Sequence, residues 1–332
     1  MESLKEFKEE LEEKIKESDQ VFISPHRFID LDAMASAIGF SLISRKFSKP
    51  NHIFIYDDEY KIEPGTKVIY DETRDNFSFI SPEKYDKLKS DNDLLILTDT
   101  NKKNLIGCQE HLDSFKNIAI LDHHNAGDET VKTDLSYLSD TSSSTCELLV
   151  DLLSLFNVKY DESIANYLLS GIYLDTKKLQ NGVTSKTFQV VSKLMDKGAD
   201  LSKAQELLAE EFKKDLKVQE LVQKAALYTY TYALAVGEED KRYTREELAK
   251  VADWLLGYRG VDASFAVGYT EDEIVSISAR SRGEIDVSKL MALLNGGGNA
   301  HSAATRINSS EIEAVGKDLA KILRPTGFIE NK

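Results

Sequence analysis

The chain has very few cysteines. Cys108 and Cys146 are the only two among 332 residues, and they form no close-spaced motif. This scarcity excludes a disulfide-stabilised scaffold and a zinc site built from cysteine thiolates. It is typical of proteins that work in a reducing compartment.

The chain also lacks long hydrophobic runs. No apolar stretch reaches the roughly 18 residues that would suggest a transmembrane helix. Residues 1–20 instead predict a charged amphipathic helix, with Leu4, Phe7, Leu11 and Ile15 at close to helical spacing. We expect no signal peptide, no membrane partner and a cytoplasmic location.

Positive charge is not in excess. The chain contains 57 Asp and Glu against 42 Lys and Arg, which gives a formal net charge of −15. Affinity for long nucleic acids comes mainly from Lys and Arg that neutralise phosphates, so this balance disfavours a long nucleic acid as partner. A small anionic substrate held by metal ions needs no such positive field.

The first half of the chain alternates short apolar runs with helical stretches. Strands are expected at 21–24, 53–56, 67–70, 94–98 and 118–121, and helices at 33–47, 146–155 and 163–170. This alternation implies βαβ units and a largely parallel sheet. The continuous hydrophobicity of 94–97 fits a strand covered on both faces. The predicted fold class is therefore α/β.

The pattern changes near residue 200. Residues 187–197 predict a helix closed by Gly198, and a long linker helix is expected from Leu201. From about residue 225 a second strand-rich segment follows. Its strands are expected at 228–236, 263–269 and 273–279, before a glycine cluster and a helix near 311–323. We therefore expect two domains, divided between residues 200 and 222.

Acidic and imidazole side chains follow several of the apolar runs. They are His26, Asp30 and Asp32 after 21–24, Asp99 after 94–98, Asp122, His123 and His124 after 117–121, and Asp175 after 171–174. Open α/β sheets bind ligands outside the carboxyl ends of their strands. Taken singly, such an aspartate is more often a helix N-cap, but their joint occurrence favours a metal site.

The donor types suit a pair of divalent cations. The spacing from His26 to Asp32 lets one loop direct its donors to two adjacent points, and Asp99 is placed to bridge them. Two cations about 3.5–4 Å apart can clamp both oxygens of a phosphoryl transfer. Carboxylates with a few imidazoles favour Mn²⁺, although ligand type alone also allows zinc or cobalt. The pattern predicts a metal-dependent hydrolase.

The glycine cluster Gly296-Gly297-Gly298 marks the end of the second segment. By itself it is equally consistent with a tight turn of positive φ and with a turn that cradles an anion before the closing helix. Arg280 and Arg282 alternate with small residues on an expected strand, where such charges are usually solvated. These residues alone leave the alternatives open.

Together these residues resemble the DHH/DHHA1 phosphoesterases. His26-x-x-x-Asp30-x-Asp32, Asp99, Asp122-His123-His124 and Asp175 match the four motifs of that superfamily in order. The segments 171–177, 187–188, 197–200, 277–281, 296–298 and 303–305 are similar to the catalytic half of GdpP-type cyclic di-AMP phosphodiesterases. The resemblance implies a parallel-sheet DHH domain over 1–200, a helical linker over 201–222 and a smaller mixed α/β DHHA1 domain over 223–332.

The resemblance also implies roles for individual residues. One Mn²⁺ would be held by His26, Asp30 and Asp99, and a second by Asp32, Asp99, His123 and Asp175. Asp122 would orient its neighbours, His124 would face the substrate phosphate and Arg280 would neutralise charge. The nucleotide would be contacted by Arg280, Gly296, Gly297, Gly298, Asn299 and His301.

One position departs from the family pattern. GdpP-type proteins usually carry a histidine directly after the glycines, whereas this chain has Asn299 there and His301 two positions later. Either His301 takes over the contact or the nucleotide is held differently.

The implied function is Mn²⁺-dependent hydrolysis of cyclic di-AMP to the linear dinucleotide pApA, and on to AMP if a free 5′ phosphate is accepted. A nanoRNase/pAp phosphatase shares the four motifs and would prefer short linear oligonucleotides. A catalytically weakened nucleotide-binding regulator is the alternative outside the enzymes. The resemblance is also compatible with a homodimer.

Overall fold

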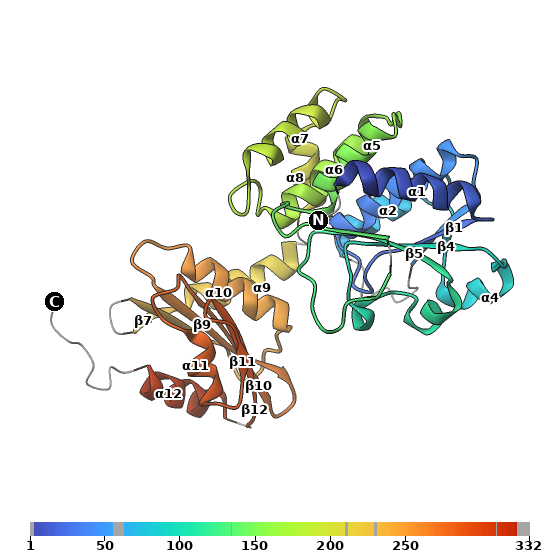
Figure 1. Ribbon diagram of the computed structural model, residues 1–332. Helices are drawn as coiled ribbons and strands as arrows, with labels where there is room; N and C mark the ends of the chain where they lie inside the picture. The colour runs from blue at the N-terminus through green and yellow to red at the C-terminus, as the bar shows by residue number, and fades with distance from the viewer. Residues whose placement is uncertain are drawn as a thin grey trace. The chain divides into compact units, whose positions relative to one another are not determined.

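The structure is a computed structural model that describes residues 3–55, 63–133, 135–209, 212–228, 231–309 and 311–323. The chain divides into two compact units, Met1–Ala209 and Glu210–Lys332. Each unit contains its own six-stranded sheet (Figure 1). Among the described residues, no helix is both long enough and apolar enough to span a bilayer.

The first unit is built on a parallel sheet. In spatial order its strands are β3 (Phe79–Ile80), β2 (Asn51–Phe54), β1 (Val21–Ser24), β4 (Leu94–Thr98), β5 (Asn117–Asp122) and β6 (Leu135–Leu138). All neighbouring strands pair in parallel. The chain runs outward from β1 on one side and from β4 on the other. Such a reversal opens a crevice at the carboxyl ends of the two central strands.

Helices cover this sheet, chiefly on one face (Figure 1). They are α1 (Leu4–Glu17), α2 (Leu31–Lys46), α3 (Pro64–Thr73), α4 (Tyr85–Leu88), α5 (Thr145–Leu155), α6 (Glu162–Asp175), α7 (Ser185–Met195) and α8 (Leu201–Leu207). Short 3-10 turns, η1 (Pro82–Lys84), η2 (Lys103–Leu105) and η3 (Gln109–Ser114), complete the unit. Helix α2 packs against α5, α6 and the sheet, so every position from Leu31 to Ser41 is buried.

The strands of the first unit are buried on both faces. On β1, Val21 and Ile23 lie in the larger core with α1, α2, α5 and α6. Phe22 lies in the smaller core, where its ring contacts Phe54 and Tyr85. This two-sided burial explains why the strand sequences are continuously apolar, as predicted for 94–97.

The predicted strand at 67–70 is wrong, because these residues lie in α3. Pro64 occupies the first turn of α3, where its fixed φ favours a helix start. Ile69 is buried while Lys67 and Val68 are exposed, which is a one-sided helical pattern. Strands β3 and β6 were not predicted, and Tyr56 of the predicted strand 53–56 lies outside the described residues.

The second unit has a smaller mixed sheet. Its strands, in spatial order, are β11 (Gly297–Gly298), β12 (Ser302–Asn308), β10 (Ile274–Ser281), β9 (Ala263–Glu271), β8 (Tyr232–Val236) and β7 (Ala226–Tyr228). Only β8 and β9 pair in parallel. Helices α9 (Phe212–Gln223) and α10 (Arg245–Leu256) share one core with the sheet, and α11 (Val287–Ala292) and α12 (Ile312–Ile322) share the other.

The expected fold class, a parallel α/β unit followed by a smaller mixed unit, is confirmed. The single linker helix predicted from Leu201 is wrong, because α8 ends at Leu207 and α9 begins at Phe212. The strand predicted at 228–236 is a hairpin of β7 and β8, with residues 229–230 outside the described part of the chain. The residues of 226–236 have strand composition throughout, so the sequence does not show where one strand ends and the next begins.

Candidate active site

The loop after β1 and the start of α2 carry three predicted metal-binding side chains. His26 forms an isolated β-bridge with Ile106, which fixes the backbone just past β1. Asp30 is the N-cap of α2 and accepts a 2.9 Å hydrogen bond from Ala33 N. The sequence predicts that Asp32 lies in the same loop as His26 and Asp30. Asp32 instead lies in the first turn of α2, where it is buried. The capped helix start therefore sets the spacing of the three donors.

The N-terminus of α5 holds the Asp32 carboxylate. Asp32 Oδ2 accepts a hydrogen bond from Thr145 N (2.8 Å), and Oδ1 accepts one from Cys146 N (2.9 Å). Free amides and the helix dipole both favour negative charge at this end of a helix. Sequence analysis missed this support. The Ser and Thr run at 141–145, which includes the N-cap Ser144, is the signal that could have found it.

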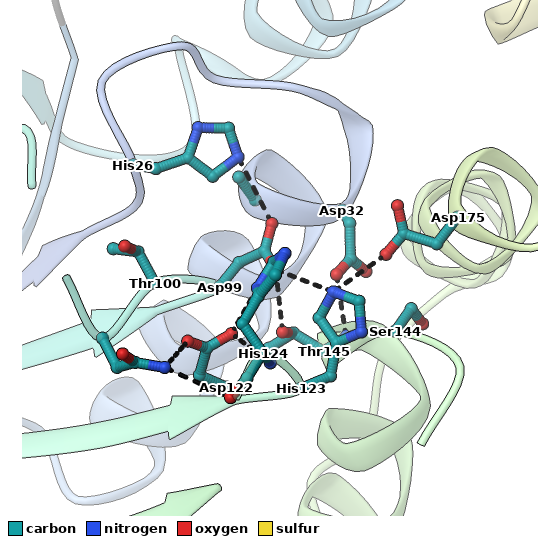
Figure 2. Close-up of polar contacts among 12 residues, drawn as sticks. His26, Asp32, Asp99, Thr100, Asp122, His123, His124, Ser144, Thr145 and Asp175 are labelled. Carbon is teal, nitrogen blue, oxygen red and sulfur yellow. Dashed lines mark hydrogen bonds and ion pairs between the residues drawn. The ribbon is translucent and has the colours of Figure 1, made fainter. Parts of the chain in front are cut away.

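Asp99 lies at the centre of the candidate site (Figure 2). It follows β4 with φ 58°, a left-handed conformation that aspartate adopts more readily than most residues. Asp99 Oδ2 lies 3.4 Å from His26 Nε2, and Oδ1 lies 3.5 Å from His123 Nε2. Thr145 Oγ1 donates a 3.0 Å hydrogen bond to Oδ1. One carboxylate thus faces donors on both sides.

Asp175 reaches the site from a helix, not from the strand end that was predicted. Helix α6 continues through 171–174 to Asp175. These residues are apolar on several sides because α6 packs against α2, α5, α7 and α8, and a short buried run does not distinguish helix from strand. Asp175 Oδ2 lies 3.3 Å from His123 Nε2. This oxygen is buried and accepts no hydrogen bond from the residues that the structure describes.

The backbone directly after α6 is strained. Lys177, Lys178 and Leu179 have φ values of 48°, 61° and 62°, and a left-handed residue other than glycine costs about 1–2 kcal/mol. Buried Thr176 holds the turn, because its Oγ1 accepts a hydrogen bond from Leu179 N (3.0 Å) and donates one to Ile172 O (2.6 Å). Such strain persists only where surrounding contacts determine the conformation.

In each of three overlapping groups of residues, the ligand atoms lie within 4.8 Å of one another. The groups are His26, Asp30 and Asp99; Asp32, His123 and Asp175; and Asp99, His123 and His124. The structure thus brings together every residue predicted to bind metal. All donors are carboxylate oxygens and imidazole nitrogens, a set that suits divalent cations such as Mn²⁺. The lack of a hydrogen-bond donor to Asp175 Oδ2 among the described residues fits the same interpretation.

The electrostatics of the site favour a bound cation. Burial, reinforced by the charge of Asp32, raises the pKa of Asp99 well above its usual value, and burial with the same charge raises the pKa of Asp175. Burial alone would lower the pKa of His26, but its interactions with Asp30 and Asp99 outweigh this and raise the pKa to about 10. Protons or cations must therefore balance these buried carboxylates.

Buried Asp122 orients His124. Its Oδ1 accepts hydrogen bonds from His124 N (3.1 Å) and His124 Nδ1 (2.8 Å), and its Oδ2 accepts one from Asn101 Nδ2 (2.7 Å). The hydrogen bond to Asp122 raises the pKa of His124. Asn101 in turn accepts a 3.0 Å hydrogen bond from Thr130 Oγ1. Asn101 carries no sequence signal that would have identified it.

A cavity of about 440 Å³ opens onto these side chains. It is lined by His26, Phe28, Asp30, Asp99, Thr100, Asn101, Lys102, Leu105, Asp122, His123, His124 and Asp175. Its volume lies in the usual range for small-molecule sites. The carboxylates and imidazoles therefore stand where a small ligand can reach them.

The glycines predicted to contact substrate lie at the edge of the second sheet. Gly296 and Gly297 line another cavity, of about 360 Å³, together with residues of β10, β12 and α10. Gly298 has φ 144°, and a Cβ there would lie 2.3 Å from Ser302 O. Gly297 and Gly298 pair with β12. The cluster therefore forms an edge strand rather than a turn that begins a helix.

The other predicted substrate contacts of the second unit have partners within it. Asn299 Oδ1 accepts hydrogen bonds from His301 N and Ser302 N, both 2.9 Å, and so closes a tight turn. The exposed His301 ring places Nδ1 3.3 Å from Ser281 O. Arg280 Nε donates a 3.1 Å hydrogen bond to the Asp253 carboxylate. Asn299 thus has a structural role in the turn that follows the glycines.

Two family models match this chain. The model for the DHH family, N-terminal domain, matches residues 20–172, and the model for the DHHA1 domain matches residues 223–324. Together they cover most of the chain. The chain belongs to the DHH/DHHA1 phosphoesterase family.

Known proteins of this family resemble the chain over different lengths. The cyclic-di-AMP phosphodiesterase PdeA of Listeria monocytogenes is 32% identical over 318 residues, which cover 93% of this chain and 48% of PdeA. The probable bifunctional oligoribonuclease and PAP phosphatase NrnA of Streptococcus mutans is 30% identical over 185 residues, which cover 55% of this chain and 54% of NrnA. The chain thus spans about half the length of each relative.

The fold agrees with a solved structure. The crystal structure of an exopolyphosphatase-related protein from Bacteroides fragilis has a TM-score of 0.72 and 17% sequence identity, and the match covers 95% of both chains. At this identity the likeness establishes the fold alone. The two-unit α/β architecture is therefore shared with a solved protein.

Proposed function

We propose that this protein is a Mn²⁺-dependent phosphodiesterase that hydrolyses cyclic di-AMP to pApA. The main support for the proposal is that Asp99 belongs to two groups of candidate metal ligands. One of its carboxylate oxygens faces His26 and the other faces His123. The similarity to PdeA along 93% of this chain supports the choice of substrate. The acidic composition favours a small nucleotide over a long nucleic acid.

In the proposed site, His26, Asp30 and Asp99 would hold one cation, and Asp32, Asp99, His123 and Asp175 would hold the second. The raised pKa of Asp99 supports this assignment, as does Asp175 Oδ2, which accepts no hydrogen bond from the described residues. When bound, the cations would supply positive charge for the transferring phosphoryl group and would acidify water.

The chain's own residues would position and protonate the substrate. Asp122 holds His124 Nδ1, so His124 Nε2 is left to contact the phosphate or to protonate the leaving 3′ oxygen. The hydrogen bond from Asp122 raises the pKa of His124, which favours the protonated ring that this role requires. Because Asn101 holds the other Asp122 oxygen, the carboxylate cannot rotate away.

The second unit would hold the rest of the nucleotide. Arg280, Gly296, Gly297, Gly298, Asn299 and His301 stay our candidates for these contacts. Exposed His301 could replace the histidine that GdpP-type proteins carry after the glycines. Arg280 could neutralise phosphate charge, although it would then share its guanidinium with Asp253.

Hydrolysis by the full chain tests the proposal. We expect cyclic di-AMP to be converted to pApA with Mn²⁺, and no product when a chelator replaces the metal. Rates on cyclic di-AMP, pApA and 3′-phosphoadenosine 5′-phosphate would be compared in one buffer. Cleavage of the two linear substrates without turnover of cyclic di-AMP would refute the substrate assignment.

That outcome would favour the second candidate, a nanoRNase/pAp phosphatase. The similarity to NrnA over 55% of the chain supports this candidate. A nucleotide-binding regulator would instead bind metal and nucleotide without turnover. The cytoplasmic location and the homodimer stay predictions, which fractionation and sedimentation would test.

A further inference from the structure

An aromatic side chain is exposed inside the cavity that holds the candidate metal ligands. Phe28 lines this cavity with His26, Asp30 and Asp99. Its side chain is 51% exposed, whereas the adjacent Ile29 is 1% exposed. A single exposed apolar side chain is ordinary on a protein surface, but this one lines a cavity together with carboxylates and imidazoles, where a bound ligand can contact its ring.

The segment around Phe28 is fixed on both sides. Arg27 N donates a 2.7 Å hydrogen bond to Leu105 O, next to the β-bridge between His26 and Ile106. On the other side Ile29 is buried in the larger core of the first unit. The Arg27 guanidinium lies over the Phe28 ring at 5.0 Å from its centroid, so one face of the ring is covered by a cation.

The lining near Phe28 suits a nucleotide better than an inorganic phosphate. A site for pyrophosphate or polyphosphate needs only cations and hydrogen-bond donors, to which an apolar ring contributes nothing. A nucleobase offers a flat face that stacks on aromatic rings. Lys102 and Leu105 bound the same cavity. They add one positive charge for a phosphate and one apolar contact for a base.

We propose that Phe28 is the stacking platform for the nucleobase next to the scissile phosphate. It would thereby select nucleotides over inorganic polyphosphates. This inference rests on the proposed function, because it places the base at the same site. The loop that supplies the ligands His26 and Asp30 would also supply the base contact, which couples substrate choice to the geometry of the metal site.

Kinetics of variants of the full chain test this role. Phe28→Ala should raise KM for cyclic di-AMP about 10-fold, because base stacking on an aromatic ring is worth about that factor or more, while kcat changes by less than about twofold. Phe28→Trp should restore KM. The matched control is Phe188→Ala on α7, because Phe188 is also 51% exposed but does not line the cavity.

An abasic analogue of cyclic di-AMP, which lacks both bases, separates stacking from a general effect on the site. The wild type and Phe28→Ala should hydrolyse it with the same kcat/KM. A pApA analogue carrying 2-aminopurine gives a readout independent of turnover, because stacking quenches its fluorescence. The wild type should quench it on binding, and Phe28→Ala should not.

The outcomes distinguish the two hypotheses. If Phe28→Ala keeps the wild-type KM for cyclic di-AMP, or loses as much kcat/KM on the abasic analogue, the stacking role is refuted while the proposed function stands. If the wild type cleaves no dinucleotide but quenches 2-aminopurine through Phe28, the proposed function fails and the stacking site stands. Absence of both hydrolysis and quenching overturns both.

Discussion

Gly171 leaves the space that the Asp32 carboxylate occupies. A Cβ at position 171 would lie 2.8 Å from Asp32 Oδ1 and 2.7 Å from Cys146 Sγ. Helices α2, α5 and α6 therefore meet at this glycine, and the missing side chain lets Asp32 reach the amides at the start of α5. Gly171, which has no side chain and cannot bind metal, thus determines the position of the candidate metal ligand Asp32.

Gly171→Ala should weaken metal binding. The added methyl group must displace Asp32 or α5, and loss of the support of a metal ligand typically costs about 10- to 100-fold in affinity. Calorimetric titration with Mn²⁺ would measure the change. Gly127→Ala is the matched control, because no atom lies within 4 Å of a Cβ there. Wild-type affinity in Gly171→Ala would contradict the packing argument.

Asp99→Asn should abolish activity while the fold survives. Asparagine adopts the left-handed conformation at this position as readily as aspartate, and the neutral amide relieves repulsion among the buried carboxylates. We expect activity to fall at least about 100-fold, with a metal-free melting temperature equal to or above that of the wild type. Melting curves and hydrolysis rates would test both. The exposed Asp113→Asn should change neither.

The metal-free protein should lose stability as the pH rises. The pKa of His26 is raised from 6.5 to about 10, so above pH 6.5 the folded chain holds a proton that the unfolded chain releases. This contribution to the free energy of unfolding is complete below pH 6.5 and is lost as the pH approaches 10. Melting temperatures in a chelator should fall across this range, and less steeply for His26→Gln. Equal slopes would refute the assignment.

Asn101→Ala should slow turnover without removing the metal. The variant frees one oxygen of Asp122 and so loosens the carboxylate that orients His124. We expect kcat to fall about 10-fold, with unchanged Mn²⁺ stoichiometry. Thr130→Val removes the donor to Asn101 together with the acceptor of Gly127 N, leaves the Asn101 amide in place and should have a smaller effect. Loss of bound metal in Asn101→Ala would show a structural role instead.

The sequence predicted the central donors because they end buried strands. The runs before Asp99 and Asp122 are apolar and short, and β4 and β5 are neighbours in a parallel sheet, so their ends meet. The same logic gave the wrong element for Asp175, since a buried helix end and a buried strand end have the same composition. It also placed a strand at 67–70, where the helix start at Pro64 decides the structure.

The supporting contacts could not be predicted in this way. Asn101 and Thr145 act through positions far away in the chain, and Gly171 acts through the space it leaves. The Ser and Thr run at 141–145 signals the start of α5, but it does not reveal that the amides there hold Asp32. Phe28 is an ordinary apolar residue in the sequence, and only its exposure within the cavity distinguishes it.

The strand order of the first unit has a consequence for how the protein matures. The donors come from four segments: the end of β1 with the start of α2, the end of β4, the end of β5, and the end of α6. Each group of donors combines side chains from at least two of these segments. No fragment that stops short of α6 can hold the complete set. Ion uptake should therefore require that all of these segments have docked, and a metal-sensitive dye added during refolding of the full chain would report when that assembly is complete.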